Sequence, residues 1–317
     1  MKLLTYSLGE QERIGAIDDG GHIVDLHRAY GSYLHAVESR PGADKLAAII
    51  LGRDMVEFLQ RGAKSLDAAR KASAYVAANP DGAGGGVFER RQVRLLAPVP
   101  RPGALVSAGK NFSDHVAEMS SRQGPSYPVA FPKLPGTVIG PHEDIPLPPE
   151  VKNLDYEVEL AVIIGKSCTD VTEQEALDYV AGYAAFNDIS ARDVIRAESK
   201  TGIHLMGKSF LGFAPMGPYL VTADEIPEPQ DLKLWLRVNG ETRQDSNLGY
   251  MIFKIREMIA YWSQMTLNPG DVLTTGTPRG VAAGRKPDQT PWWLKPGDVV
   301  EAEVENIGLL RNRIVAE

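Results

Sequence analysis

Two glutamates, Glu157 and Glu159, open the stretch LDYEVELAVIIG (residues 154–165), which otherwise reads as a buried β-strand. Alternate residues of a strand point to the same face, so the two carboxylates lie side by side, about 6.6–6.8 Å apart along the chain. Two desolvated anions this close repel each other, so that one protonates or a cation binds between them. Oxygen ligands favour a hard divalent ion, Mg²⁺, Mn²⁺ or Ca²⁺. The six histidines show no zinc-binding pattern.

The same spacing also has an ordinary structural reading. Glu301, Glu303 and Glu305 repeat it, and there it predicts a solvated strand face, because Val300, Ala302 and Val304 form a clean apolar face opposite. After Glu159, by contrast, both faces of the predicted strand are apolar, which makes solvated glutamates less favourable. Spacing alone leaves both readings of the glutamate pair open.

Asp188 is the candidate third carboxylate. The capping box TEQE at residues 172–175 predicts a helix, TEQEALDYV, and the following GYAAFNDISARD begins as a strand. A helix followed by a returning strand could bring Asp188 beside Glu157. An aspartate after an asparagine is also a common turn residue, so the third ligand stays open at this point.

A candidate acid–base pair lies upstream, in KNFSDHVAEM. Ser113 is a candidate N-cap for a short helix, on which His115 and Glu118 share a face at positions i and i+3. A carboxylate beside an imidazole orients it and raises its basicity, which suits the activation of a water molecule. The alternative is a surface helix on which this contact has no function.

The elements that must position these residues are mostly strands. Residues 1–30 alternate as strands, and residues 42–78 have the apolar spacing of helices; the glycine-rich 81–86 reads as a linker. Residues 234–243 predict a hairpin around Asn239-Gly240, and residues 248–263 predict an amphipathic helix. We therefore expect a small α+β domain over residues 1–85 and a mainly β domain over residues 93–317, of the barrel or roll type.

Composition narrows the classes of partner. The chain has 317 residues and a formal net charge of −7, which argues against nucleic acid. No apolar run approaches the roughly 20 residues of a membrane span. Nothing resembles a signal peptide, and the single cysteine, Cys168, excludes an internal disulfide, so we expect a cytoplasmic protein. We predict that Cys168 is an unreactive structural residue rather than a nucleophile.

Seven segments, in order from about Leu95 to the C-terminus, resemble the fumarylacetoacetate hydrolase family. They are SAGKNFSDHVAEM, LDYEVELAVIIGK, GYAAFNDISARDV, GKSFLGFAPMGPYLV, VNGETRQDSN, LNPGDVLTTGTPRGV and LKPGDVVEAEVENIGLLRN. The resemblance implies a rolled, mixed β-sheet barrel as catalytic domain, usually in a homodimer. Residues 1–80 resemble the variable N-terminal domain of longer members.

The resemblance also implies roles for individual residues. Glu157, Glu159 and Asp188 match the family's Mg²⁺ or Mn²⁺ ligands. Positions matched as catalytic are His115 and Glu118 on a lid helix and Lys208 of the GKSF motif; those matched as substrate-binding are Lys110, Arg192 and Thr277.

One departure from the family pattern bears on the reaction. Ile195 stands where some hydrolytic members have glutamine, and it cannot orient a substrate or water by hydrogen bonding. Residues 194–207 are the least family-like part of the core, and we assign them to the substrate mouth, with His204 as a loop residue.

The expected substrate is a small anionic 2-oxo acid, which chelates the metal through its carboxylate and ketone oxygens. The first hypothesis is hydrolysis of the C–C bond of an acylpyruvate-type β-diketo acid, with loss of a pyruvate enolate. The alternative is decarboxylation or isomerisation of a 2-oxo-hexene-dioate or oxaloacetate-like acid in aromatic catabolism. A hypothesis of another class is a non-catalytic binding protein in which the cation is structural.

Overall fold

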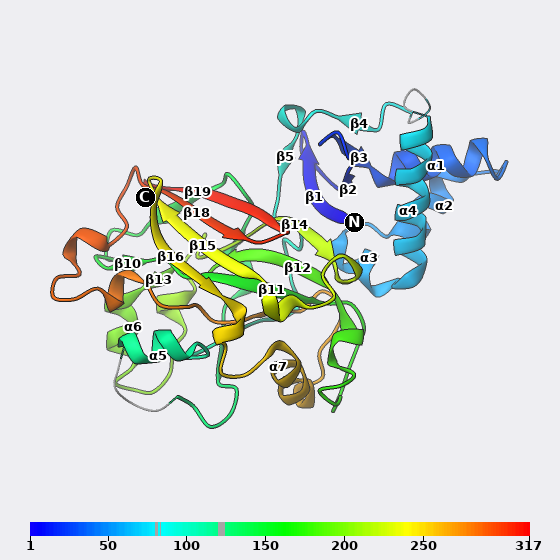
Figure 1. The fold of residues 1–317 in the computed structure, drawn as a ribbon. Helices are drawn as coiled ribbons and strands as arrows, with labels where there is room; N and C mark the ends of the chain where they lie inside the picture. The colour runs from blue at the N-terminus through cyan, green and yellow to red at the C-terminus, as the bar shows by residue number, and fades with distance from the viewer. Residues whose placement is uncertain (80–81, 83, 120–123) are drawn as a thin grey trace.

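The computed structural model describes residues 1–79, 82, 84–119 and 124–317. Part of the predicted glycine linker, residues 81 and 83, lies outside the described residues. The fold is mixed α+β and mostly sheet, as the sequence predicts (Figure 1).

The larger sheet has twelve strands and is mixed. Its order is β4 (Val87–Phe88), β3 (Ile23–Asp25), β2 (Gln11–Ile17), β1 (Lys2–Leu8), β14 (Ala214–Thr222), β12 (Val180–Asn187), β11 (Val158–Ile164), β17 (Val272–Thr274), β6 (Leu105–Ala108) and β7 (Ala130–Pro132), with β5 (Arg94–Leu95) on β1 and β8 (Val138–Ile139) on β14. Within the described residues this path has two free ends, because the N-terminal strands extend one edge. The rolled sheet is therefore open and does not close into a barrel, and this agrees with the mainly β, rolled fold that the sequence predicts.

A second sheet and a short ribbon complete the strands. The second sheet runs β16 (Glu241–Asn247), β15 (Lys233–Val238), β18 (Val299–Val304), β19 (Gly308–Ala316) and β9 (Asp144–Leu147); the ribbon joins β10 (Leu154–Asp155) to β13 (Ser190–Ala191). The predicted Asn-Gly hairpin is confirmed between β15 and β16, where Asn239 and Gly240 both have positive φ. This left-handed pair matches the twist of the two strands.

Four helices pack beside the N-terminal strands: α1 (Leu26–Ala36), α2 (Ala43–Leu51), α3 (Met55–Gln60) and α4 (Ala63–Ala78). The predicted helical segment 42–78 is confirmed as three helices, whereas α1 starts inside the segment read as strands. Figure 1 shows α1, α2 and α4 far from the second sheet. The division at residues 85–93 stays a prediction, since β1 pairs directly with β14 across it.

The remaining α-helices are α5 (Ser113–Met119), α6 (Arg192–Glu198) and α7 (Ile255–Trp262). The 3₁₀ turns are η2 (Arg90–Gln92), η3 (Pro135–Thr137), η4 (Ala176–Tyr179), η5 (Met206–Lys208), η6 (Ala223–Glu225), η7 (Pro229–Asp231), η8 (Leu248–Tyr250), η9 (Ser263–Met265), η10 (Ala282–Gly284) and η11 (Thr290–Trp292). Across the described part of the chain, no helix combines the length and the apolar character needed to cross a membrane.

Three helix predictions need correction. The Thr172–Glu175 capping contacts form, but only the 3₁₀ turn η4 follows them before the chain enters β12. The predicted helix 248–263 is divided into η8, α7 and η9. Ser113 does not cap α5: it is the first residue of the helix, and its hydroxyl donates to the Tyr250 carbonyl instead.

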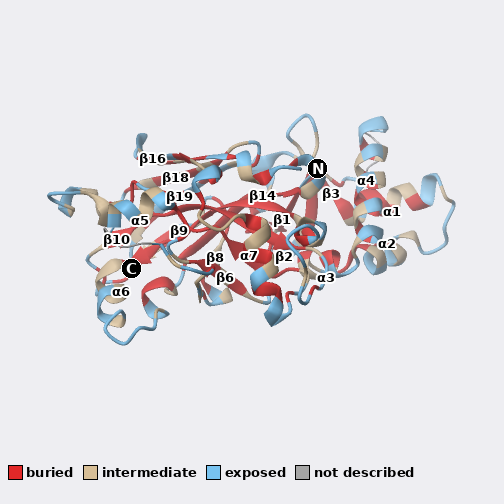
Figure 2. Cartoon of the chain, turned by 60° about the horizontal axis from the view of Figure 1, so that its bottom comes forward, coloured by how far each residue is buried: buried red, intermediate tan, exposed pale blue. Residues whose placement is uncertain are grey.

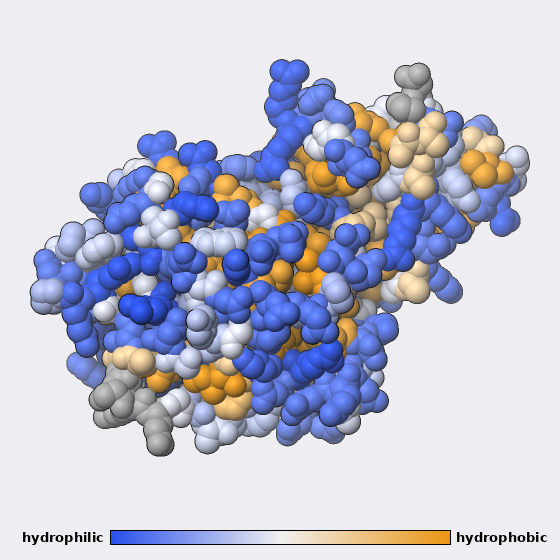
Figure 3. Space-filling model, in the orientation of Figure 1, coloured by the Kyte–Doolittle hydropathy of each residue, from blue (hydrophilic) through white to orange (hydrophobic). Residues whose placement is uncertain are grey.

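Strand β11 is buried on both faces, which explains its unbroken apolar run. Figure 2 shows that buried residues gather on the strands in the middle of the molecule. Leu160, Val162 and Ile164 belong to the core that contains the second sheet, while Ala161 and Ile163 belong to the core beneath the N-terminal helices. The outer surface contrasts with this interior, because the face seen in Figure 3 is mostly hydrophilic. The glutamates that precede and begin β11 are thus held in the centre of the molecule.

Asp25 joins the start of α1 to the sheet, and its loss should destabilise the fold. Its buried carboxylate accepts from Tyr6 Oη at 2.7 Å, from the Arg28 N–H at 3.0 Å and from Arg13 Nε. Burial by itself would raise the pKa of Asp25, but Arg13 and the other donors hold it below its ordinary value. We expect Asp25→Asn to lower the free energy of unfolding by about 3 kcal/mol, since it leaves Arg13 without its charge partner. Urea denaturation measures this loss.

The matched control is Asp54→Asn, because Asp54 caps α3 through the Glu57 N–H and asparagine caps nearly as well as aspartate. The Asp25 contribution is present above the unfolded pKa of about 3.9 and fades as pH falls through the lower folded pKa. The difference between wild type and Asp25→Asn should therefore shrink in acid. An equal loss for both variants, or no change with pH, contradicts this account.

Candidate metal centre and active site

The structure brings Glu157, Glu159 and Asp188 together; we refer to them as the carboxylate trio. One oxygen from each lies within 4.8 Å of the others, and all three side chains are buried. Antiparallel pairing causes this arrangement: Val158 lies opposite Asn187, so the residue after β12 meets the residue before β11. The Asp188 N–H donates to the Glu157 carbonyl at 2.8 Å. The returning strand alone therefore places Asp188, without the helix predicted before it.

Basic side chains neutralise two members of the trio. Lys208 Nζ donates to Glu157 Oε2 at 2.6 Å and to Asp188 Oδ2 at 2.7 Å. Arg192 Nη2 donates to the other oxygen of Glu157. Burial would raise the pKa of Glu157, but the charges of Arg192 and Lys208 hold it well below its ordinary range. Glu157 is thus an anion even without a metal ion.

Glu159 is the exception, since no lysine or arginine of the described residues forms an ion pair with it. Its Oε2 accepts only from the Gly276 N–H, at 3.0 Å. Burial, followed by the charges of Asp188 and Glu157, raises the pKa of Glu159 well above its ordinary value. Without a bound cation this environment favours the protonated form of the carboxyl, and a divalent ion would favour its ionised form. The donor set therefore fits a hard divalent cation.

Two further charged residues complete the centre, and the sequence analysis missed both. Lys133 Nζ, fully buried just after β7, donates to Asp188 Oδ1 at 2.6 Å. Asp155 accepts from Arg192 Nε at 2.8 Å and from two backbone N–H groups of η10. Asp155 could have been found, because it continues the same-face spacing of Glu157 and Glu159. Nothing in the sequence around Lys133 distinguishes it.

His115 and Glu118 lie on α5 as expected, but their contact is loose. His115 Nδ1 is 3.8 Å from Glu118 Oε2 and has no hydrogen-bond partner among the described residues. Glu118 instead accepts from the Gly280 N–H, at 3.0 Å to Oε2. Burial would raise the pKa of Glu118, but His115 and this N–H hold it below its ordinary value. His115 lies near enough to the trio that a proton gained by its imidazole would act on the charge of Glu157.

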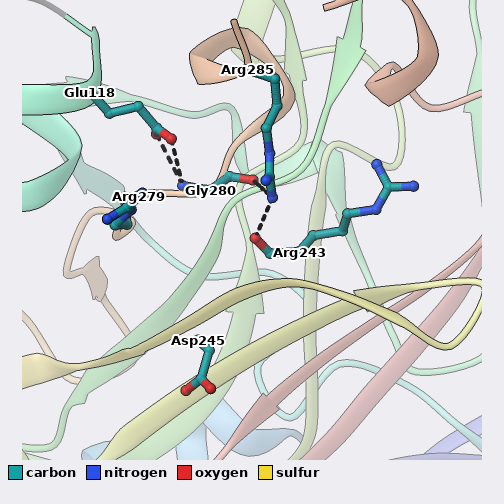
Figure 4. A pocket seen from close by; sticks show the side chains of 6 residues that line it. All are labelled: Glu118, Arg243, Asp245, Arg279, Gly280 and Arg285. Atoms are coloured by element: carbon teal, nitrogen blue, oxygen red, sulfur yellow. Dashed lines mark hydrogen bonds between the residues drawn. The ribbon is translucent and has the colours of Figure 1, made fainter.

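A cavity of about 260 Å³ opens beside α5. Its lining residues are Glu118, Arg243, Asp245, Arg279, Gly280 and Arg285 (Figure 4). In Figure 4 the Glu118 carboxylate points at the Gly280 N–H, and the backbone carbonyl of Arg243 receives Arg285. Glu118 is therefore anchored to the 279–284 loop through the same oxygen, Oε2, that lies nearest to His115.

The other predicted site residues are more dispersed. Lys110 is exposed, in a left-handed turn between β6 and α5. The Thr277 hydroxyl donates to the Val158 carbonyl at 2.9 Å and accepts from Gln244 at 2.8 Å, so its proton is committed to the protein. His204 lies in the loop after α6. Arg192 and Lys208 are thus the predicted basic residues that contact the trio.

Comparisons with known proteins show the family of this chain. The family model for the fumarylacetoacetate (FAA) hydrolase C-terminal domain matches residues 104–315. The mitochondrial oxaloacetate tautomerase Fahd2a of Rattus norvegicus is 44% identical over 84% of this chain and 80% of its own length. The human mitochondrial oxaloacetate tautomerase FAHD2A is 42% identical over 84% of this chain and 81% of its own.

Three solved structures have the same fold. A fumarylacetoacetate hydrolase from Exiguobacterium antarcticum matches with a TM-score of 0.78 at 32% identity, and both chains are covered completely. A 5-carboxymethyl-2-hydroxymuconate delta-isomerase from Mycobacterium smegmatis matches with a TM-score of 0.71 at 28% identity. The match covers 100% of this chain and 99% of the isomerase. The third structure is a maleylpyruvate hydrolase from Sphingobium sp. SYK-6 in complex with manganese(II) and pyruvate. It matches with a TM-score of 0.72 at 28% identity, over 100% of this chain and 99% of the hydrolase.

The chain belongs to the fumarylacetoacetate hydrolase family. It is an enzyme of the hydrolase, isomerase or tautomerase type, with a buried acidic trio suited to a divalent metal ion. The two oxaloacetate tautomerases are described as mitochondrial, so the cytoplasmic location expected from the sequence stays a prediction.

Proposed function

We propose that this enzyme interconverts the keto and enol forms of a short, oxaloacetate-like 2-oxo acid. The observation that carries the proposal is the position of Lys208: its ammonium group lies on two of three buried carboxylates, next to a third that has no cationic partner among the described residues. With a divalent ion held by the three carboxylates, the ion and Lys208 would place positive charge where a chelating 2-oxo acid develops negative charge. The two oxaloacetate tautomerases above support this choice of reaction.

The carboxylate trio would hold Mg²⁺ or Mn²⁺, which polarises the carbonyl of a chelating 2-oxo acid and favours its enolate. Lys133 and Lys208 restrain the two oxygens of Asp188, and Arg192 restrains Glu157, so these ligands are oriented before any ion binds. Their orientation is the contribution of the protein to selecting a hard, oxygen-liganded cation.

In the proposed reaction a proton moves from carbon C3 of the substrate to its C2 oxygen. His115, with Nδ1 free of hydrogen bonds, accepts the C3 proton; the electron pair of that C–H bond forms the C2–C3 double bond. Lys208 stabilises the charge that grows on the C2 oxygen, which then takes up a proton. Glu118 stabilises the protonated His115. The proton that the C2 oxygen takes up is the one that His115 accepted, so the base is regenerated. One C–H bond is broken, one O–H bond is formed and the double bond moves from C2–O to C2–C3, so no water or oxidant is consumed.

Hydrolysis of an acylpyruvate-type acid is the second candidate, and the likeness to a maleylpyruvate hydrolase favours it. The same enolate would then form by cleavage of the C3–C4 bond after water attacks C4, with His115 as the base. Ile195 weakens this candidate, because it packs against Gly207 and offers no polar group to orient the water. We therefore place tautomerisation first.

A panel of 2-oxo acids assayed with Mg²⁺ or Mn²⁺ tests the proposal. We expect a catalysed change in the ultraviolet absorbance of oxaloacetate as enol converts to keto, with no change in mass. Products whose total mass exceeds that of the substrate by one water would show hydrolysis instead of tautomerisation. A product lighter than the substrate by CO₂ would show decarboxylation.

Oxalate, a planar mimic of the enolate, is a second probe for the same experiment. It should inhibit competitively and bind only when the metal is present. No turnover on any 2-oxo acid, together with oxalate binding that ignores the metal, would favour a protein in which the cation is structural.

A further inference from the structure

Glu198, the last residue of α6, holds the backbone that leads into Lys208. Its Oε1 accepts from the N–H groups of Leu205 at 3.2 Å and Met206 at 2.6 Å, and its Oε2 accepts from the Gly207 N–H at 3.1 Å. Three consecutive N–H groups that converge on one carboxylate form a charge-assisted anchor for a turn. The chain from residue 199 to residue 204 is thereby closed into a loop whose two ends are tied together.

The anchored segment is η5, the 3₁₀ turn that carries Lys208. Lys208 reaches the centre from this turn and donates to both Glu157 and Asp188. Since a lysine side chain has four rotatable carbons, its ammonium group keeps a set position only if the backbone beneath it is fixed. The Glu198 carboxylate supplies that restraint.

Close packing of η5 on α6 is an independent sign of the same restraint. A Cβ atom at Gly207 would lie 2.5 Å from Ile195 Cγ1 and 2.9 Å from Ile195 N, so the turn touches the helix directly. The first residue of the helix, Arg192, donates to Glu157. One short helix therefore positions both cations that meet at Glu157, one through its own side chain and one through Glu198.

We propose that Glu198 is a positioning residue for catalysis: it sets the place of the Lys208 ammonium group and does not touch the substrate. The proposal rests on the function proposed above, in which Lys208 stabilises charge on the substrate oxygen. It also assigns a role to the 194–207 segment. Ile195 and Glu198 of α6 hold η5 in place, and the exposed residues 199–203 connect α6 to the chain that enters η5.

A double-mutant cycle with Mn²⁺-loaded enzyme tests it, using Glu198→Ala, Lys208→Met and the double variant. We expect Lys208→Met to lower kcat on the order of 10²–10³-fold. Glu198→Ala should lower kcat about 10- to 100-fold, because misplacement of a group by about 1 Å costs up to that much, and should change KM less. In the Lys208→Met background, Glu198→Ala should have almost no further effect, since both variants remove the same interaction.

Glu198→Gln gives a graded test, because its single carbonyl oxygen can keep the bonds to Leu205 and Met206 but not the one to Gly207. Its loss of kcat should be smaller than that of Glu198→Ala. The control is Glu175→Ala, which removes another carboxylate bonded to local backbone, at Thr172, and should leave kcat unchanged. Amide hydrogen exchange of metal-free protein should be faster at residues 205–207 in Glu198→Ala and unchanged there in Glu175→Ala.

The outcomes separate this proposal from the function on which it rests. Wild-type turnover in Lys208→Met overturns the function assigned to Lys208. An impaired Lys208→Met beside a fully active Glu198→Ala, or two losses that multiply in the double variant, overturns the positioning role. Amide hydrogen exchange at residues 205–207 that is unchanged in Glu198→Ala also overturns the positioning role. If Glu198→Ala does not fold, Glu198→Gln decides, since a folded variant with wild-type kcat and unchanged exchange at Gly207 contradicts the proposal.

Discussion

Glu159→Gln is expected to abolish divalent-cation binding while leaving the metal-free protein nearly as stable as wild type. Glutamine has the shape of a protonated glutamate, and the raised pKa of Glu159 favours the neutral form of this side chain in the metal-free centre. The affinity for Mn²⁺ should fall by more than about 100-fold, because even residues behind the metal ligands typically contribute 10–100-fold. Turnover should fall with it. Calorimetric titration with Mn²⁺ measures the affinity.

Thermal and urea unfolding with and without Mn²⁺ complete this experiment. At a Mn²⁺ concentration of 100 times the Kd, binding stabilises wild type by about 2.7 kcal/mol, and this increment should be absent in Glu159→Gln. Glu157→Gln is the matched contrast: it removes a buried anion from Arg192 and Lys208, so it should destabilise even the metal-free protein, by about 3–5 kcal/mol. Equal losses of metal-free stability in the two variants would contradict the assignment of charge within the trio.

His115→Ala should lower kcat about 10²–10⁴-fold, the usual contribution of a positioned general acid or base, with little effect on Mn²⁺ affinity. The imidazole lies on α5, outside the carboxylate trio, and its Nδ1 makes no hydrogen bond within the described residues. Its removal therefore takes away a proton acceptor and not a ligand or a structural contact. Steady-state kinetics at saturating Mn²⁺, with titration of Mn²⁺ into the same variant, measure the two effects.

His35→Ala is the control, because His35 is an exposed residue in the last turn of α1, among the N-terminal helices and outside the site. It should keep wild-type kcat. Glu118→Gln should lower kcat less than His115→Ala, since Glu118 acts on the proton through His115. Turnover by His115→Ala would require another base, for which Lys208 is the next candidate, and loss of Mn²⁺ binding would mean that His115 helps to form the metal site.

Local sequence was enough for the mainly β fold and for part of the site. The period-2 pattern of β18 is confirmed, with Val300, Ala302 and Val304 buried and Glu301 and Glu303 partly exposed. The Asn239-Gly240 turn is also confirmed. It could be predicted from the dipeptide itself, since few other dipeptides accept two positive φ angles. The pairing of Glu157 with Glu159 on one face likewise follows from strand geometry alone. These features depend only on residues close together in the chain.

Tertiary structure decided what depends on residues far apart in the chain. The 3₁₀ turn η4 replaced the predicted helix because the chain must enter β12 at Val180 to pair with β11, and sheet pairing outweighs a local cap. The N-terminal strands kept the large sheet open. No sequence pattern marks Lys133, because its partner Asp188 lies 55 residues away. None marks Glu198 either, because its partners are the backbone N–H groups of residues 205–207. Burial is also the largest cause of the raised pKa of Glu159, and burial is a property of the folded chain.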